Sequence, residues 1–231
     1  DVSVASVGPK LEVERSYNSL DPRVGFFGKG WSTLLDFRID ALTTPTGMTV
    51  RRPDGRVEFY GRNSDGVSYE PPFGLGSKFR QCVQADAPVC PGTNYLLTDP
   101  DGTVYQFQAN GLLARVTDEF GHELRFTWSG GAPVSISSYA SPTASSPMRN
   151  LLLTTTTVSG SPVVTTVKTD AVTGQGQSTW TYGYTATAQG AALTSVNDPI
   201  NPAPSTVRTV YEYNGAGGRL SKWKNPGNAS F

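Results

Sequence analysis

The chain has 231 residues, 19 basic and 19 acidic, and a charged fraction of only 16%. A formal net charge of zero provides no long-range field to attract nucleic acid or an anionic membrane surface, so we expect neither partner. The apolar runs are too short to cross a bilayer, so we expect no membrane insertion. Because 25 Gly and 17 Pro interrupt helical patterning throughout, the composition predicts an all-β fold.

Residues 1–50 form an opening segment with the patterning of strands. Residues 11–17 begin with apolar and acidic side chains in alternation, which is the period of a half-buried strand. Residues 34–42 and 46–52 are predicted as further strands, with Thr46-Gly47 as the turn between them.

The glycine-rich stretch at residues 25–30, Gly-Phe-Phe-Gly-Lys-Gly, superficially resembles a phosphate-binding loop. A phosphate-binding loop needs Ser or Thr after its Lys and a helix whose N-terminus meets the anion, and neither follows here. We therefore expect these glycines to allow a sharp bend that places Trp31 in an apolar layer.

Residues 51–130 contain a hairpin motif that recurs: a tight turn of Asp and Gly, followed by a strand with aromatic side chains. The turns contain Asp54-Gly55, Asp101-Gly102, and Asp118 with Gly121. Gly tolerates the positive φ of a tight turn and Asp can accept hydrogen bonds from the turn backbone, so we assign all six a structural role. Repetition of a unit that cannot bury its apolar face alone predicts an array of hairpins.

The strand after each turn is expected to have one packed and one solvated face. In one strand, Val57 and Phe59 share a face opposite Glu58 and Tyr60. In another, residues 123–128 repeat this alternation, with Leu124, Phe126 and Trp128 on one side and Glu123, Arg125 and Thr127 on the other.

Three further regions complete a chain that we interpret as one β-rich repeat region, 1–231. Residues 62–91 are rich in Gly, Pro and Ser and are predicted as an insertion in the array. Residues 131–150 are predicted as a loop or linker, and residues 151–231 as further strands and repeats.

The only two cysteines, Cys82 and Cys90, lie in the predicted insertion. A disulfide between them would close a short loop and contribute about 2–3 kcal/mol at most on the chain-entropy model. We predict this disulfide from the all-β, low-charge context; the alternative is two unpaired thiols on a surface insertion. Two cysteines without a nearby His cannot complete the four ligands of a zinc site, so we expect no metal.

No set of residues indicates catalysis. The single histidine, His122, directly follows a repeat turn and is interpreted as a solvated strand residue. No nucleophile motif supports a Ser-His-Asp triad, and Asp99 with Asp101 offers too few oxygens for calcium. Paired carboxylates for glycoside hydrolysis stay open because their separation depends on the fold. We expect no enzymatic activity, no catalytic residue and no cofactor.

Three aromatic residues, Trp180, Tyr182 and Tyr184, alternate along one strand and share a face. One interpretation is the packed face of a large sheet, in which cross-strand aromatic pairs contribute about 0.2–1 kcal/mol each. The other is a flat platform for cell-surface glycans, which would make the chain an extracellular carbohydrate or cell-wall binding module with exposed Trp180 and Tyr182. We favour packing.

The order of several motifs resembles the RHS or YD-repeat family. Its loose pattern of Gly-x-Leu, a short strand, Asp-x-x-Gly and another strand is followed by Gly111, Leu113, Val116, Asp118, Gly121 and Phe126. Residues 218–228 follow it again, and residues 11–19 with 25–31 resemble the segment that precedes the repeats in many such proteins.

This resemblance implies both a fold and a function. The antiparallel hairpin repeats would form a curved sheet or partial barrel, as a section of a hollow shell that encloses a C-terminal polypeptide, often a toxin. The partners would be the rest of a longer chain and that cargo, in a secreted or cell-surface protein. The chain lacks an initiator Met and stops within a repeat, so we expect a longer polypeptide with an export signal elsewhere. An isolated section would leave sheet edges unpaired, so we expect it to self-associate.

Overall fold

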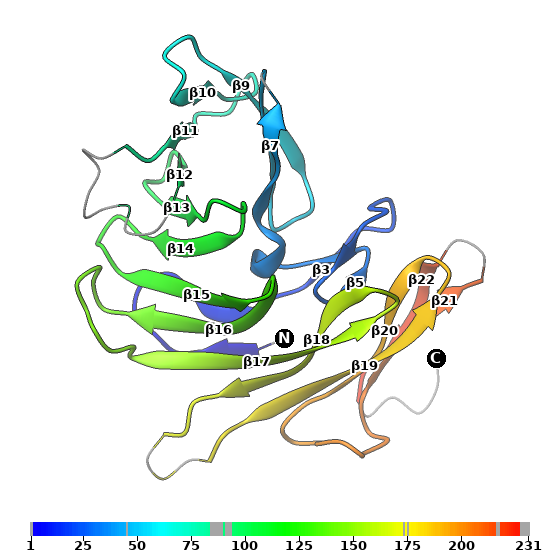
Figure 1. Cartoon of the computed structure of the whole chain (residues 1–231). Helices are drawn as coiled ribbons and strands as arrows, with labels where there is room; N and C mark the ends of the chain where they lie inside the picture. The colour runs from blue at the N-terminus through cyan, green and yellow to red at the C-terminus, as the bar shows by residue number, and fades with distance from the viewer. Residues whose placement is uncertain are drawn as a thin grey trace.

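The structure is a computed structural model that describes residues 2–44, 46–83, 90, 94–172, 174, 176–215 and 218–226. Within these residues the fold is all-β except for one short 3-10 helix, as predicted. Its main feature is a 16-stranded antiparallel sheet in which every strand pairs with its neighbours in sequence (Figure 1). The sheet curves strongly without closing into a barrel.

The strands of this sheet fall into two halves. The first half contains β7 (Arg38–Thr44), β8 (Gly47–Arg51), β9 (Val57–Arg62), β10 (Ser68–Glu70), β11 (Lys78–Gln81), β12 (Tyr95–Thr98), β13 (Val104–Phe107) and β14 (Leu113–Thr117). The second half contains β15 (Glu123–Ser129), β16 (Ala132–Tyr139), β17 (Arg149–Val158), β18 (Ser161–Thr169), β19 (Thr179–Thr187), β20 (Gly190–Asn197), β21 (Thr209–Asn214) and β22 (Arg219–Lys224).

Residues 2–37, here called the N-terminal segment, precede the sheet. They form β1 (Val2–Val4), β2 (Leu11–Val13), β3 (Ser16–Tyr17), β4 (Val24–Gly25), β5 (Gly28–Lys29), β6 (Trp31–Ser32) and the 3-10 helix η1 (Leu34–Asp36). The strands pair as β1–β2, β3–β6 and β4–β5. β2 contacts β16 and β17, and β5 contacts β20, so the segment lies on the inner side of the curve (blue in Figure 1).

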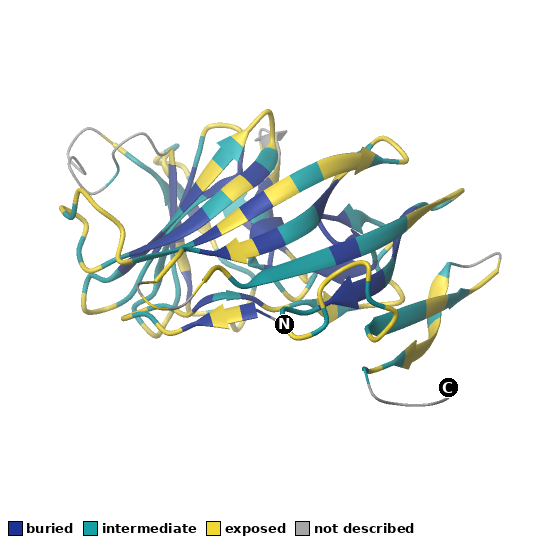
Figure 2. Cartoon of the chain, turned by 90° about the horizontal axis from the view of Figure 1, so that it is seen from below, coloured by how far each residue is buried: buried dark blue, intermediate teal, exposed yellow. Residues whose placement is uncertain are grey.

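Buried and exposed residues alternate along the strands, as Figure 2 shows. The predicted alternation of β9 is confirmed, but its packed face carries Glu58 and Tyr60. Tyr60 is 0% exposed, whereas Phe59 on the other face is 50% exposed. The reason is Arg52, which is buried and donates from Nε to Glu58 Oε2 (2.8 Å), so the carboxylate has a partner inside.

In β15 the predicted inner residues Leu124 and Phe126 are buried as expected. Glu123, expected on the solvated face, is buried as well. The turn after β16 covers it: Arg125 bonds Glu123 through Nε (2.8 Å) and reaches the carbonyl oxygen of Pro142 through Nη2 (2.8 Å). The outer face of the sheet is therefore partly covered at this point.

Four sequence boundaries need correction. Residues 34–36 form η1 rather than a strand, because Thr33 caps the helix and Asp36 completes a capping box. Gly47 belongs to β8 and pairs with Thr44, so it is not a turn residue. The predicted insertion at 62–91 contains β10 and β11, paired in order within the sheet. The predicted loop or linker at 131–150 contains β16 and the start of β17, which leaves a shorter connection between them.

Candidate functional site

The inner face of the sheet, together with the N-terminal segment packed on it, is the candidate functional site. The first contact of the segment with the sheet is made by β2, whose side chains alternate as the sequence predicts. Leu11 and Val13 are buried in the core cluster that also contains Ile136 and Leu151 of β16 and β17. Glu12 and Glu14 point the other way and line a cleft of about 670 Å³ with Asp54 and Asp101 of the turns.

The glycine-rich stretch at residues 25–30 is a tight hairpin pressed against the second half of the sheet. The backbone carbonyl of Phe26 accepts a hydrogen bond from the Val164 N–H at 2.8 Å. Gly28 has φ +100°, and a Cβ there would lie 2.8 Å from the Ala191 carbonyl oxygen. The glycines thus allow the predicted bend, and Trp31 is buried after them. The close approach to the sheet backbone is an additional finding.

Asp36 fixes this hairpin to η1. Its Oδ1 accepts from the Phe26 N–H (3.1 Å), and its Oδ2 accepts from the N–H and the hydroxyl of Thr33 (2.9 and 3.1 Å). Burial raises the pKa of the Asp36 carboxyl, against the hydrogen bonds from Phe26 and Thr33, which favour its charged form. Asp36 therefore has a structural role at the centre of the segment.

Arg15 connects the N-terminal segment to the sheet. Its guanidinium carbon lies 4.9 to 5.7 Å from the ring centres of four aromatic residues: Phe27, Trp31, Tyr182 and Tyr211. Its Nη2 also donates to the Tyr211 hydroxyl at 3.0 Å. Two of these rings belong to the segment and two to β19 and β21, so one cation is shared across the interface. We call these five residues the Arg15 cluster.

Two further hydrogen-bonded contacts extend this interface to the last strands. Trp31 Nε1 donates to the Tyr213 hydroxyl (3.0 Å), which itself donates to the Leu193 carbonyl oxygen (2.8 Å). The Tyr17 hydroxyl accepts from the Leu220 N–H of β22 (2.7 Å). The segment is therefore bound to strands that follow it by some 200 residues in sequence.

The aromatic residues of β19 belong to this interface. Tyr182 is 4% exposed and its ring lies 4.9 Å from that of Phe27, edge to face. The Tyr184 hydroxyl donates to the Val164 carbonyl oxygen (2.7 Å), and burial raises the pKa of Tyr184. Trp180 is partly buried against the same core. The structure thus agrees with packing, and the exposed Tyr182 that a glycan platform requires is not observed.

The predicted turn residues lie in turns. Asp54, Asp101 and Asp118 each accept a hydrogen bond from the backbone N–H two residues later, at 2.9 to 3.0 Å. Gly55, Gly102 and Gly121 all have φ between +84° and +86°. These contacts explain the residues fully as parts of turns.

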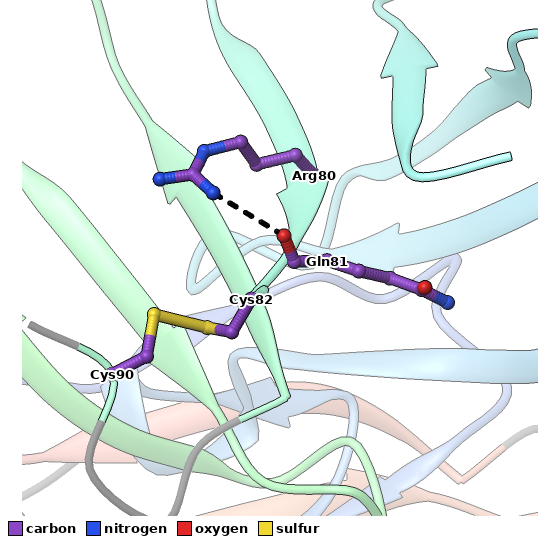
Figure 3. Close-up of a disulfide and its surroundings, with 4 residues drawn as sticks. All are labelled: Arg80, Gln81, Cys82 and Cys90. Atoms are coloured by element: carbon purple, nitrogen blue, oxygen red, sulfur yellow. Dashed lines mark hydrogen bonds between the residues drawn. A yellow bond between two sulfur atoms is a disulfide. The ribbon is translucent and has the colours of Figure 1, made fainter. Parts of the chain in front are cut away.

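Cys82 and Cys90 form a disulfide just after β11 (Figure 3). Beside it, Arg80 donates from Nη1 to the carbonyl oxygen of Gln81 at 3.3 Å. The residues 84–89 within the closed loop lie outside the described part of the chain. The disulfide lies in the first half of the sheet, away from the Arg15 cluster.

The single histidine contacts an aspartate of its own turn. His122 Nδ1 lies 2.9 Å from Asp118 Oδ2, within the same turn. Among the described residues, no group of three His, Cys, Asp or Glu side chains is placed to hold a metal ion. In the same part of the chain, no helix is long and apolar enough to cross a membrane.

Comparisons with known proteins give partial matches. Residues 1–60 match a family described as "Domain of unknown function (DUF6531)". Over 129 residues, 55% of this chain, the sequence is 27% identical to "tRNA nuclease WapA" of Bacillus subtilis (strain 168). It is 28% identical over the same length to "tRNA3(Ser)-specific nuclease WapA" of Bacillus spizizenii. The chain spans only 5% of the length of these relatives.

The fold resembles a solved structure titled "Structure of the N-terminal domain of effector protein SpvB from Salmonella typhimurium strain LT2". The TM-score is 0.53 over 85% of this chain and 96% of that chain, with 12% sequence identity, so the likeness is one of fold. The relatives are named as tRNA nucleases and the solved neighbour as a domain of an effector protein.

Proposed function

We propose that this chain is a structural section of a secreted or surface YD-repeat protein, whose curved sheet encloses polypeptide and helps deliver a C-terminal, toxin-like cargo. The observation that carries the proposal is the N-terminal segment held on the inner face of the sheet. Backbone, aromatic and cationic contacts all join the two, so this inner face packs polypeptide rather than solvent.

Two further observations support the proposal. The chain matches a small part of much longer relatives named as nucleases, which fits a section of a larger protein whose activity lies elsewhere. Its own regularly placed carboxylates, Asp54, Asp101 and Asp118, are occupied as turn residues. In this proposal the section has no enzymatic activity and no cofactor, and its partners are the rest of its own chain and the enclosed cargo.

The test uses the native polypeptide from the source organism. An antibody against this chain captures the secreted protein, and its size is read by immunoblot and its peptides by mass spectrometry. The captured protein is then digested under native conditions, with the order of peptide release followed in time. We expect a species several-fold larger than this chain, with C-terminal peptides released only after the repeat sheet itself is cut.

Two outcomes would contradict enclosure. One is a secreted species of the size of this chain alone. The other is release of the C-terminal peptides before any peptide of the sheet, which would show an exposed cargo. A control digestion in denaturant establishes that the C-terminal region contains cleavable sites, so that late release reports protection.

A further inference from the structure

A small pocket lies on the opposite face of the sheet from the N-terminal segment. It has a volume of about 180 Å³ between β13–β15 and the turn that follows β16, and its walls include Val104, Gln106, Arg115, Thr117, Glu123 and Pro142. Tyr105, Val116 and Leu124, which alternate with these residues along the strands, pack into the inner core. The pocket is therefore separate from the proposed enclosing face.

The turn over the pocket is held in place by Arg125. Its Nη2 donates to the carbonyl oxygen of Pro142 (2.8 Å) and its Nη1 to that of Ala144 (3.2 Å). The guanidinium also lies over the Tyr139 ring, with its carbon 3.7 Å from the ring centre. The roof of the pocket is thus tied to the sheet by charged and aromatic contacts.

The polar groups in the pocket have unused hydrogen-bonding capacity. Gln106 is 3% exposed and its Oε1 has no hydrogen-bond partner. Glu123 is 1% exposed; Arg125 bonds its Oε2 at 2.8 Å, while Arg115 and Thr117 approach its Oε1 only at 3.5 Å. Leaving a buried acceptor unpaired is unfavourable, so Gln106 indicates a missing donor.

We propose that this pocket binds a primary carboxamide. Its two N–H groups supply donors for Gln106 Oε1 and Glu123 Oε1, and its carbonyl accepts from Arg115, whose contacts to Glu123 are long. Arg115 and Arg125 both contact Glu123, so the pocket has a net positive charge that disfavours a cationic ligand. A carboxylate ligand would bring no donor for Gln106. A short aliphatic stem fits the apolar wall of Val104 and Pro142. The inference is independent of the proposed enclosing role.

The carboxamide has two natural sources: a free small amide, or the side chain of Asn or Gln on another polypeptide segment. The test is nuclear magnetic resonance of the 231-residue protein titrated with acetamide, monitoring the side-chain signals of Gln106 and Arg115. Blocked glutamine, N-acetyl-glutamine-N′-methylamide, forms a second arm. We expect saturable shifts with a dissociation constant of roughly millimolar order, as a four-atom ligand allows. Tighter binding of blocked glutamine than of acetamide assigns the polypeptide source, and the reverse assigns the free amide.

Matched ligands and variants make the test decisive. N,N-dimethylacetamide keeps the carbonyl but has no N–H, and acetate replaces the donor by a charge; we expect both to bind at least about tenfold more weakly. Gln106→Leu should abolish the shifts of Arg115 without unfolding the protein, since the Gln106 oxygen has no partner to lose. Gln108→Leu, beyond the end of the same strand and outside the pocket walls, is the control and should leave binding unchanged.

Three results would overturn the proposal. The first is no saturable shift with acetamide or blocked glutamine, which would mean that ordered water, and not an amide, occupies the pocket. The second is equal binding of acetamide and dimethylacetamide, which would show that no donor is recognised. The third is tighter binding of glucose, tested as a neutral polyol, than of either amide.

Discussion

The two halves of the sheet fill their inner faces in different ways. In the first half, β7 bends back to the hairpin between β13 and β14, where the Ile39 N–H donates to the Gly111 carbonyl oxygen at 2.9 Å. This half is filled largely by aromatic side chains of its own strands: Tyr60, Tyr69 and Tyr95 pack around Phe79, with ring centres 5.0 to 6.1 Å from that of Phe79. Phe37 at the end of the N-terminal segment packs there as well, against Tyr105 and Phe107. Among the described residues, no strand of the second half bends back to contact a distant strand in this way. The N-terminal segment packs on the inner face of this half instead.

The difference shows how the fold stabilises an open sheet. In the first half a return contact joins distant strands. In the second half the N-terminal segment supplies apolar surface that packs on the inner face of the sheet. The first half should therefore depend on its return contact, and the second on the contacts of residues 2–37. Mutations can test each dependence separately.

The largest effect is expected from Gly111→Ala in the first half. Gly111 has φ +82°, and a Cβ there would lie 2.3 Å from the Ile39 carbonyl oxygen, so the return contact must shift. We expect a loss of about 3–4 kcal/mol in the free energy of unfolding, measured by urea denaturation. The matched control is Gly131→Ala, with φ +83° and nothing within 4 Å of the added Cβ, which should lose only about 1–2 kcal/mol. Equal losses in the two variants would show that the return contact contributes nothing.

The next largest effect is expected from Arg15→Met in the second half. The variant keeps an apolar stem but loses the cation shared by four rings and the bond to Tyr211. We expect a loss of about 3 kcal/mol, with faster hydrogen exchange in residues 2–37 and unchanged exchange in β8–β13. Arg56→Met, which removes an exposed turn ion pair, is the control and should stay within about 0.5 kcal/mol. Uniformly faster exchange throughout the sheet would contradict a local role.

Much of the first half could be predicted from the sequence because neighbouring residues alone determine its turns. Asp101-Gly102 and Asp118 with Gly121 specify tight turns through side-chain bonds and positive φ, and both depend on neighbouring residues alone. The disulfide between Cys82 and Cys90, which is predicted from the all-β, low-charge context, is also present in the structure.

The rest could not be predicted, because long-range packing decides it. Glu58 has the pattern of a solvated residue, and its buried position is acceptable because Arg52 Nε (2.8 Å) and the Tyr60 hydroxyl (3.0 Å) both donate to its carboxylate. Arg15 carries no local signal, since its four aromatic neighbours come from three distant stretches of chain. The sequence shows only that Arg15 follows the alternating residues of β2 and precedes a glycine-rich stretch with two Phe and a Trp. That order does not predict a contact between Arg15 and the rings.

A smaller effect, confined to the first half, is expected from removing the disulfide. Cys82→Ser with Cys90→Ser opens a short loop beside β11 and should lower the free energy of unfolding by no more than about 2–3 kcal/mol. Because the loop lies away from the Arg15 cluster, hydrogen exchange of residues 2–37 should not change in the folded protein. Adding a thiol reductant to the parent protein should reproduce the loss. Faster exchange in the N-terminal segment would show that the two halves are coupled.

The smallest effect is expected from removing a buried tyrosine hydroxyl in each half. Burial raises the pKa of Tyr105 in the first half and of Tyr213 in the second, each to about 12. Since both values exceed the unfolded value of about 10, the stability these tyrosines contribute is complete below about pH 10 and is lost as pH rises towards 12. Tyr105→Phe and Tyr213→Phe should each flatten this alkaline decline in urea midpoint. Tyr213→Phe should also lower the midpoint at neutral pH, because it removes the bond from Trp31 that joins the segment to the sheet and the bond to Leu193 within the sheet. If Tyr213→Phe did not lower the midpoint at neutral pH, the Trp31–Tyr213 hydrogen bond would contribute nothing to holding the N-terminal segment. The Arg15 cluster and apolar burial alone would then hold the segment on the second half of the sheet.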